Sequence, residues 1–197
     1  MTGFNTYIEG LDLTFLKEYC VNHGRLMQYT KGEHFLKAGE ISRYVGYVEK
    51  GYFKYTVRNK AEQKDYVSGF AFVNEFVGDY PHCLFHQQSD VTIIAETQSE
   101  VYLIDGETLK QLYETDLKLK DLALSIYEHL FNQVYSQYLD SYRTSSRERY
   151  KSLLRRCPLI VQDISLKDIA SYLHVTPTTI STIRREITFG TSFLKTF

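Results

Sequence analysis

Residues 166–187 read LKDIASYLHVTPTTISTIRREI, a stretch that fits two short amphipathic helices joined by a tight turn. Apolar residues recur at helical spacing on both sides of His174, as expected for one buried stripe on each helix. Thr176 is a good N-cap, and Pro177 suits the first helical position, where no backbone N–H is required. The stripes comprise Leu166, Ile169, Ala170 and Leu173 before the turn, and Ile180, Ile183 and Ile187 after it.

The spacing of these stripes is typical of a helix-turn-helix, in which the small Ala170 lets the two helices approach closely. The second helix of such a motif enters the major groove of duplex DNA. Successive helical residues are about 100° apart, so the side opposite Ile180 would face the bases. Arg185 lies on that side and can pair with guanine through two donors, while threonines can contact bases or thymine methyl groups. The predicted base-reading residues are Thr178, Thr182 and Arg185.

The flanks of the same helix are expected to meet the DNA backbone. Thr179 lies near the helix N-terminus, where its hydroxyl and the free backbone N–H groups can bind phosphate. Ser181 and Arg184 flank the base-reading side. An exposed polar face without a ligand is the alternative interpretation. The predicted DNA-binding residues are therefore Thr178, Thr179, Ser181, Thr182, Arg184 and Arg185.

The charge of the chain is unevenly distributed. From Arg143 onward there are ten lysines and arginines against four acidic residues, a net charge of +6, whereas residues 1–142 carry −7. A basic region joined to an acidic one indicates a polyanionic partner for the C-terminal part. Scattered surface charge is the simpler alternative, and the charge count alone does not exclude it.

The first 105 residues contain short runs rich in Tyr, Phe, Val and Ile, preceded by one short helix within 11–20. Residues 58–66, RNKAEQKDY, read as a polar hairpin loop. Closely spaced strands with turn signals between them predict an antiparallel β-roll of the jelly-roll type. The predicted fold class is therefore α+β. The glycines at turn-like positions between the runs are Gly32, Gly39, Gly51 and Gly78.

Residues 106–142 contain no proline and, after Gly106, no glycine, which predicts one long helix. Its apolar residues cover so broad an arc that two faces must be buried. One face can pack on the β-roll, and the same helix of a second subunit is the economical partner for the other. A helix buried entirely within one chain is the alternative. The apolar positions include Leu117, Leu122, Ile126, Tyr127, Leu130, Phe131, Val134 and Tyr138.

Membrane proteins and exported proteins find no support in the sequence. No apolar run approaches the roughly 20 residues of a membrane span, and the N-terminal residues lack the basic and apolar regions of a signal peptide. Cys20, Cys83 and Cys157 are odd in number and far apart, which favours reduced thiols over disulfide bonds. We therefore expect a cytoplasmic protein that does not bind a membrane.

Enzyme chemistry also lacks a candidate set of residues. The sequence contains no GxSxG, Walker-type phosphate loop, HExxH or paired-carboxylate pattern, so neither catalysis nor a cofactor is expected. His82, Cys83 and His86 lie close together after Gly78, but no carboxylate–histidine pattern of suitable spacing accompanies them. No metal site is predicted.

Over essentially its whole length, the chain resembles the Crp/Fnr family of bacterial transcription regulators. The resemblance rests on FLKAGEISRYVGYVEKGYFKYTV (35–57), FVNEFVGDY (72–80), AETQSEVYLID (95–105) and the helix-turn-helix of residues 166–187. It implies a β-roll sensor domain of the cyclic-nucleotide-binding type over 1–105, a dimerisation helix over 106–142 and a DNA-binding domain over 143–197. It also implies a homodimer on double-stranded DNA, RNA polymerase as a further partner, and an unidentified small-molecule effector.

The family's phosphate-binding residues are altered in this chain. Members that bind cyclic nucleotides carry a Gly-Glu pair and then an Arg-Ser pair that grips the phosphate. The matching positions here are Gly78, Asp79, Ser89 and Asp90, which are the candidate effector-pocket residues. Loss of the arginine removes a charge-assisted hydrogen bond worth about 1.5–3 kcal/mol. We therefore predict that cyclic AMP is not the effector.

Two further departures concern the DNA-binding motif. His174 occupies the turn position that the family usually gives to glycine, and histidine tolerates positive φ better than most residues do. Thr178 and Thr182 replace the family's base-reading glutamate and arginine, so an operator sequence cannot be transferred. The final stretch, TFGTSFLKTF (188–197), is short, so we expect little or no wing hairpin.

These features support one leading hypothesis and two alternatives. The leading hypothesis is a dimeric, sequence-specific transcription regulator of the Crp/Fnr type. The first alternative is a dimeric β-roll sensor or scaffold that has lost specific DNA binding. The altered base-reading positions, Thr178 and Thr182, and the short C-terminal stretch are consistent with this alternative. The second alternative is a cupin-like enzyme, which would need clustered His and Glu ligands on adjacent strands.

Overall fold

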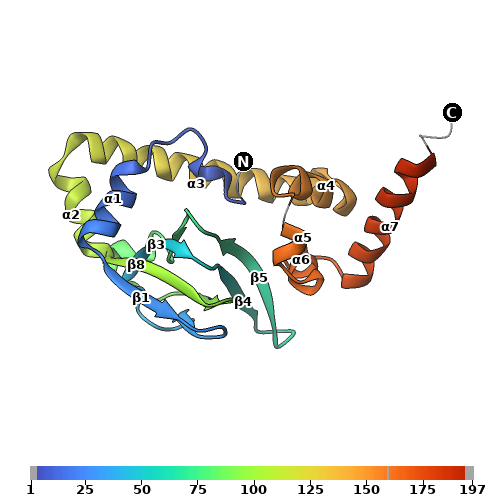
Figure 1. Cartoon of the computed structure of the whole chain (residues 1–197), viewed down its shortest axis with the longest axis horizontal. Helices are drawn as coiled ribbons and strands as arrows, with labels where there is room; N and C mark the ends of the chain where they lie inside the picture. Colours follow the sequence, from blue (N-terminus) through green and yellow to red (C-terminus); the bar gives the residue numbers. More distant parts are fainter. Residues whose placement is uncertain (1–3, 159, 194–197) are drawn as a thin grey trace. The chain divides into compact units, whose positions relative to one another are not determined.

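The computed structural model describes residues 4–158 and 160–193, with side chains described as far as Ile187. The chain forms two compact units, one of residues Phe4–Tyr135 and one that contains Ser136–Phe197 (Figure 1). Each unit has its own buried core. Within the described residues, no helix is both long enough and apolar enough to cross a lipid bilayer.

The first unit contains two antiparallel four-stranded sheets, which confirms the predicted roll. Their strand orders are β1-β8-β3-β6 and β2-β7-β4-β5. The polar loop between β4 and β5 is the hairpin expected near residues 58–66. The strands are β1 Arg25–Tyr29, β2 His34–Leu36, β3 Tyr44–Lys50, β4 Phe53–Asn59, β5 Lys64–Ala71, β6 Phe76–Val77, β7 Val91–Ala95 and β8 Ser99–Asp105.

The core of the roll receives side chains from all eight strands. Successive side chains of a strand point to opposite faces, so buried residues alternate, as Val101 and Leu103 do along β8. Phe53 is fully buried and meets the ring of Tyr29 edge to face, with centroids 5.5 Å apart. The buried cluster comprises Tyr29, Leu36, Val48, Phe53, Ala71, Val77, Ile93, Ala95, Val101 and Leu103.

The glycines between the strands adopt the backbone conformation that their turn positions require. All four predicted turn glycines have positive φ, a conformation that glycine adopts without steric cost. At Gly51 a side chain would also collide, because an added Cβ would lie 2.7 Å from the carbonyl oxygen of Gln98. The φ angles are +87° at Gly32, +89° at Gly39, +80° at Gly51 and +155° at Gly78.

The segment predicted as one helix over 106–142 is two helices, α2 Gly106–Thr115 and α3 Leu117–Arg143. The chain breaks at Asp116, which has extended backbone angles of φ −126° and ψ 121°. Its side-chain Oδ1 accepts hydrogen bonds from the backbone N–H groups of Lys118 and Leu119, at 2.8 and 3.2 Å. Asp116 therefore caps the start of α3, a local interaction that outweighs helix continuity.

A second buried cluster joins α1 Thr14–His23, α2 and the start of α3 to the roll. The N-terminal helix predicted within 11–20 is thus present, shifted toward the C-terminus. The boundary between the compact units falls inside α3, after Tyr135. The cluster comprises Leu16, Cys20, Val45, Tyr47, Cys83, Leu84, Ile104, Leu109, Tyr113, Ala123 and Ile126.

The second unit contains the two helices predicted around His174. Helix α6 Leu166–Tyr172 packs against α7 Pro177–Phe193, which continues beyond the expected end at Ile187. Ala170 is fully buried, and its carbonyl accepts a hydrogen bond from the N–H of Val175. The unit also contains the end of α3 from Ser136, helix α4 Ser146–Arg156 and helix α5 Ile160–Asp163. Its buried residues are Tyr150, Leu153, Ile160, Ile164, Ile169, Ala170, Leu173, Ile180 and Ile183.

His174 adopts φ +54°, which confirms the left-handed turn expected where the family has glycine. A β-branched residue tolerates this conformation poorly, at a cost of about 1–2 kcal/mol. We therefore expect His174→Val to lower the unfolding free energy of the second unit by that amount relative to His174→Asn. Both variants remove the imidazole, so the comparison isolates the backbone cost. Denaturant unfolding would measure it, and equal stabilities would contradict the prediction.

Candidate functional site

The first turn of α7 is capped as the sequence predicts. The side-chain Oγ1 of Thr176 accepts a hydrogen bond from the backbone N–H of Thr179 at 3.1 Å. The two threonine hydroxyl oxygens are 2.9 Å apart, so the Thr179 hydroxyl is also drawn into the cap. Pro177 is the first residue of the helix. The cap fixes where α7 begins and leaves its first turn at the surface.

The outer side of α7 is exposed and polar. Thr178, Ser181 and Arg185 are exposed, and Thr182 is partly exposed. The opposite side is buried, since Ile180 and Ile183 pack in the core of the unit. The structure thus brings these four predicted residues to one solvent-facing surface.

Arg184 is placed differently from the other predicted residues. Its Nε donates a hydrogen bond to the hydroxyl of Tyr150 on α4 at 2.7 Å, and its guanidinium lies over the same ring. The Tyr150 side chain is buried, so this contact is an internal one that holds α7 against α4. Arg184 therefore acts as a positioning residue within the unit.

Other basic residues of the unit also have structural roles. The guanidinium of Arg149 donates to the carbonyls of Thr144 and Leu173, at 2.8 and 3.3 Å. Arg147 forms an ion pair with Glu186 at 3.5 Å. The count of basic residues therefore overstates the number that can face a polyanion.

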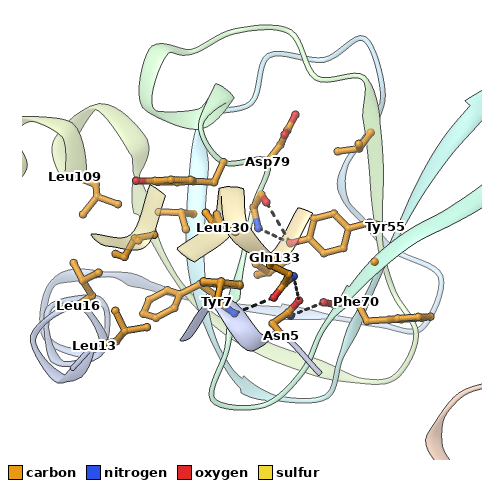
Figure 2. A pocket seen from close by; sticks show the side chains of 18 of the residues that line it. Asn5, Tyr7, Leu13, Leu16, Tyr55, Phe70, Asp79, Leu109, Leu130 and Gln133 are labelled. Carbon is orange, nitrogen blue, oxygen red and sulfur yellow. Dashed lines mark hydrogen bonds between the residues drawn. The ribbon is translucent and has the colours of Figure 1, made fainter. Parts of the chain in front are cut away.

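A cavity of ≈ 310 Å³ lies within the first unit (Figure 2). Figure 2 shows Leu13, Leu16 and Leu109 on one side of it and Tyr55 and Phe70 on the other. The N-terminal segment, the roll and α3 all contribute to its lining. Its volume is at the lower end of the range typical of small-molecule sites.

Two of the four predicted effector-pocket residues lie at the cavity, and the other two lie outside its lining. Gly78 and Asp79 line the cavity, whereas Ser89 and Asp90 do not. Ser89 is buried, and its hydroxyl bonds the backbone N–H and carbonyl of Val91, at 3.1 and 3.0 Å. Asp90 is exposed to solvent. Only the first pair of the expected set therefore lies where a ligand in the cavity could be reached.

Tyr55 holds the backbone at Gly78. Its hydroxyl donates to the carbonyl of Gly78 at 3.2 Å and accepts from the N–H of the same residue at 3.0 Å. Burial raises the pKa of Tyr55, so the hydroxyl stays protonated and can keep both bonds. A Cβ at Gly78 would lie 3.0 Å from the carbonyl oxygen of Tyr44. The backbone at Gly78 is therefore held by the Tyr55 hydroxyl and closely approached by the backbone of Tyr44.

The N-terminal segment and α3 close one side of the cavity through Gln133. The Oε1 of Gln133 accepts hydrogen bonds from the hydroxyl of Thr6 and the N–H of Tyr7, both at 2.9 Å. Asn5 donates to Oε2 of Glu75 at 2.7 Å. Sequence reasoning missed these residues, because partners 70 or more positions apart leave no local pattern.

The lining of the cavity is largely apolar and carries little charge. Among the described residues that line it there is no lysine, arginine or histidine, and Asp79 is the one carboxylate. Asp79 is 3.1 Å from Nδ1 of His82, outside the cavity lining. Burial raises the pKa of Cys20 to about 12, so this lining thiol stays protonated. The cavity therefore suits a neutral ligand better than an anion.

Comparison with known proteins finds a family model that matches part of the chain. Residues 26–116 match the family model of the cyclic nucleotide-binding domain. A search of curated protein sequences finds no match to the chain.

Solved structures with the same fold cover most of the chain. FixK2 from Bradyrhizobium japonicum has a TM-score of 0.71 and 18% identity, covering 85% of this chain and 86% of FixK2. The c-di-GMP-responsive global regulator CLP from Xanthomonas campestris has a TM-score of 0.65 and 16% identity, over 91% and 93% of the two chains. A protein described as a transcriptional regulator of the Crp/Fnr family, from Eubacterium rectale, has a TM-score of 0.66 and 16% identity, over 95% and 88%.

At these identities the structural matches establish the fold alone. Taken with the sequence match, they agree with the expected order of a β-roll followed by a helical C-terminal region. Residues 26–116 are thus similar to the cyclic nucleotide-binding domain, in a chain with the fold of solved Crp/Fnr-type regulators.

Proposed function

We propose that the protein is a transcription regulator that binds double-stranded DNA as a homodimer and responds to a small molecule other than cyclic AMP. The observation that carries the proposal is the exposed polar side of α7, on which Thr178, Ser181 and Arg185 face solvent. A capped helix with its opposite side locked in a core can present these side chains rigidly to a groove. RNA polymerase is the proposed further partner.

Specific reading of DNA would depend mainly on Arg185. Its fork of N–H donors can pair with the O6 and N7 atoms of guanine, whereas threonine and serine hydroxyls can bond with several bases. Thr178, Ser181 and Thr182 would therefore modify the base preference of the protein at neighbouring positions of the operator. Thr179 lies in the first turn of α7, next to the backbone N–H of Thr178, and would meet phosphate.

The dimer proposal rests on a stripe of exposed apolar residues along α3. Their spacing alternates between three and four residues, the pattern of a coiled-coil seam. Phe131 is 71% exposed and Val134 is 60% exposed, which is costly for large apolar side chains in a lone chain. A second copy of α3 would bury the stripe. The seam comprises Leu124, Tyr127, Phe131, Val134 and Tyr138, with Tyr135 and Tyr142 beside it.

The effector proposal follows from the charge of the cavity. A cyclic nucleotide carries a negative phosphate, which would need a cation or several donors once it left water. The described lining supplies one carboxylate and no cation. A neutral, partly aromatic molecule would gain apolar contacts there without this cost. We therefore place the effector among small uncharged ligands.

One prediction of the proposed function concerns DNA recognition. We expect Arg185→Ala to weaken binding to a selected operator by about 1–3 kcal/mol and to relax the base preference at one position of each half-site. Arg58→Ala, which removes an exposed arginine from the roll, is the matched control. Selection from random DNA followed by fluorescence anisotropy would measure both. If binding to DNA depends on the salt concentration but not on the DNA sequence, the protein would instead be a sensor that has lost specific recognition.

A second prediction concerns the dimer. Phe131→Glu places a charge in the seam twice per dimer, and we expect the dissociation constant to rise by at least about 100-fold. Asn132→Glu adds the same charge at an exposed neighbouring position outside the seam and should leave the dimer intact. Analytical ultracentrifugation would distinguish them. A monomeric wild type, or a dimeric Phe131→Glu variant, would refute the proposed interface.

A third prediction concerns the effector. Cyclic AMP should bind with a dissociation constant weaker than about 1 mM, because its phosphate finds no cation in the cavity. Indole, a small neutral aromatic molecule, should raise the melting temperature of the wild type. Leu130→Trp fills the cavity and should abolish that shift. Saturable binding of cyclic AMP in calorimetry would overturn the proposed ligand class.

A further inference from the structure

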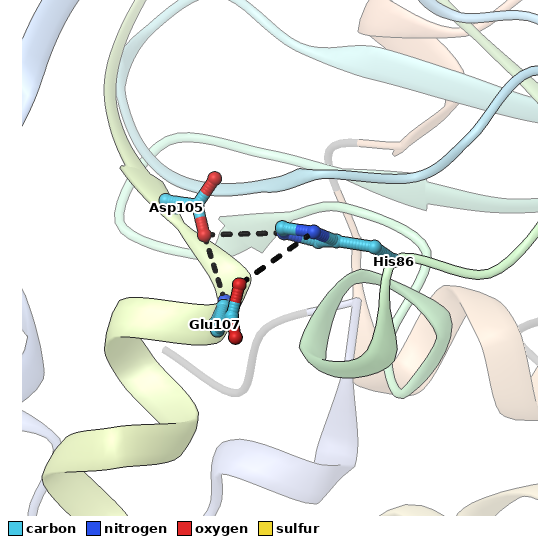
Figure 3. Close-up of side chains that lie close together, drawn as sticks. All are labelled: His86, Asp105 and Glu107. Atoms are coloured by element: carbon cyan, nitrogen blue, oxygen red, sulfur yellow. Dashed lines mark hydrogen bonds and ion pairs between the residues drawn. The ribbon is translucent and has the colours of Figure 1, made fainter.

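His86, Asp105 and Glu107 bring three metal-ligating side chains together outside the cavity (Figure 3). Nε2 of His86 is 3.2 Å from Oδ1 of Asp105, and Nδ1 of the same ring is 3.9 Å from Oε2 of Glu107. The potential ligand atoms all lie within 4.8 Å of one another. In Figure 3 the imidazole ring of His86 is seen edge-on, with Asp105 and Glu107 both on the same side of it. None of these contacts has a role in the proposed DNA or effector sites.

Two separate parts of the fold fix this arrangement. His86 ends the 3-10 helix η2 His82–Phe85 in a left-handed conformation with φ +47°. Asp105 is the last residue of β8 and caps α2 by accepting from the N–H of Glu107 at 2.9 Å. At Gly106, between the two acids, an added Cβ would meet the backbone of Cys83. The close approach of η2 to the start of α2 therefore depends on that glycine.

The charge of the cluster is not balanced by basic side chains. Within the described chain, neither Asp105 nor Glu107 forms an ion pair with a lysine or arginine. Lys110, the nearby cation on α2, lies over the ring of Phe85 and pairs with Glu114. Two carboxylates, those of the partly buried Asp105 and the exposed Glu107, thus lie beside the imidazole ring of His86. This concentrates negative charge around a nitrogen ligand.

We propose that His86, Asp105 and Glu107 bind a divalent transition metal ion, with Zn²⁺ as the probe. One imidazole nitrogen and two carboxylates form a ligand set that suits Zn²⁺, whereas Mg²⁺ and Ca²⁺ favour sites made of oxygen alone. In tetrahedral coordination at about 2.0–2.2 Å, neighbouring ligand atoms are roughly 3.3–3.5 Å apart. The ligand atoms of the cluster lie within 4.8 Å of one another, so side-chain rotations that bring both carboxylates to the same nitrogen of His86 would be needed to reach that geometry. Solvent would supply the fourth ligand.

The ion would join η2 to the junction between β8 and α2. These parts already meet in the buried cluster that contains Cys83, Leu84, Ile104 and Leu109, and the N–H of Gly106 donates a hydrogen bond to the carbonyl of Arg43 at 2.7 Å. A metal that binds the folded chain and not the unfolded one raises the melting temperature. The alternative is that the three side chains only pair with one another and bind no metal.

Calorimetric titration of the tag-free, full-length protein with Zn²⁺ tests the proposal. We expect one site per chain and a melting temperature that falls when EDTA is added. His86→Asn removes the imidazole while suiting the left-handed backbone. Glu107→Gln changes an exposed side chain without altering the cap that Asp105 provides. Each variant should weaken Zn²⁺ binding at least tenfold, and Co²⁺ bound to the wild type should give the absorption bands of tetrahedral coordination.

His82→Ala is the matched control, since His82 pairs with Asp79 and lies outside the cluster. It should bind Zn²⁺ as the wild type does. The absence of a saturable site in the wild type would overturn the proposal. So would equal affinities for the wild type, His86→Asn and Glu107→Gln, provided that melting curves in EDTA show both variants to be folded.

Discussion

The burial of Ala123 and Ile126 of α3 against the roll determines the orientation of this helix in the first unit. Because α3 turns about 100° per residue, burying that side presents the side of Phe131 to solvent. The same burial places Leu130 and Gln133 at the wall of the cavity. One packing contact thus defines both the proposed dimer seam and part of the proposed ligand site.

In the second unit, the corresponding constraint is the close packing of α6 on α7. A buried Ala170 leaves room for the isoleucines of α7, and His174 accepts a left-handed backbone so that the chain can turn between them. The unit then uses Arg149 and Arg184 for internal bonds. Its capacity to bind a polyanion is therefore concentrated in fewer residues than its composition implies.

The elements with strong local signals could be predicted from the sequence. Thr176 and Pro177 mark the start of α7, and four glycines mark turns, because caps and positive φ depend on neighbouring residues. The break at Asp116 was missed because an aspartate inside an apolar pattern can either face solvent or cap a new helix. The sequence pattern alone does not distinguish these outcomes.

The candidate sites were less predictable for a different reason. Gln133 meets Thr6 and Tyr7 only after the chain has folded, and His86 meets Asp105 in the same way. The role of Arg184 was likewise hidden, since its partner Tyr150 lies on another helix. Family resemblance did direct attention to Gly78 and Asp79, which line the cavity. It also pointed to Ser89, whose hydroxyl is occupied by the backbone of Val91.

Under the proposed function, Val134 links ligand binding to the dimer. This residue lines the cavity and also belongs to the exposed seam of α3. A ligand shifts a conformational equilibrium only by the difference in its affinity for the two states. Gln133, one residue earlier, bonds the N-terminal segment through Thr6 and Tyr7. A ligand that packs against Val134 or competes for Gln133 would therefore act directly on the helix that forms the dimer, with no relay through the roll.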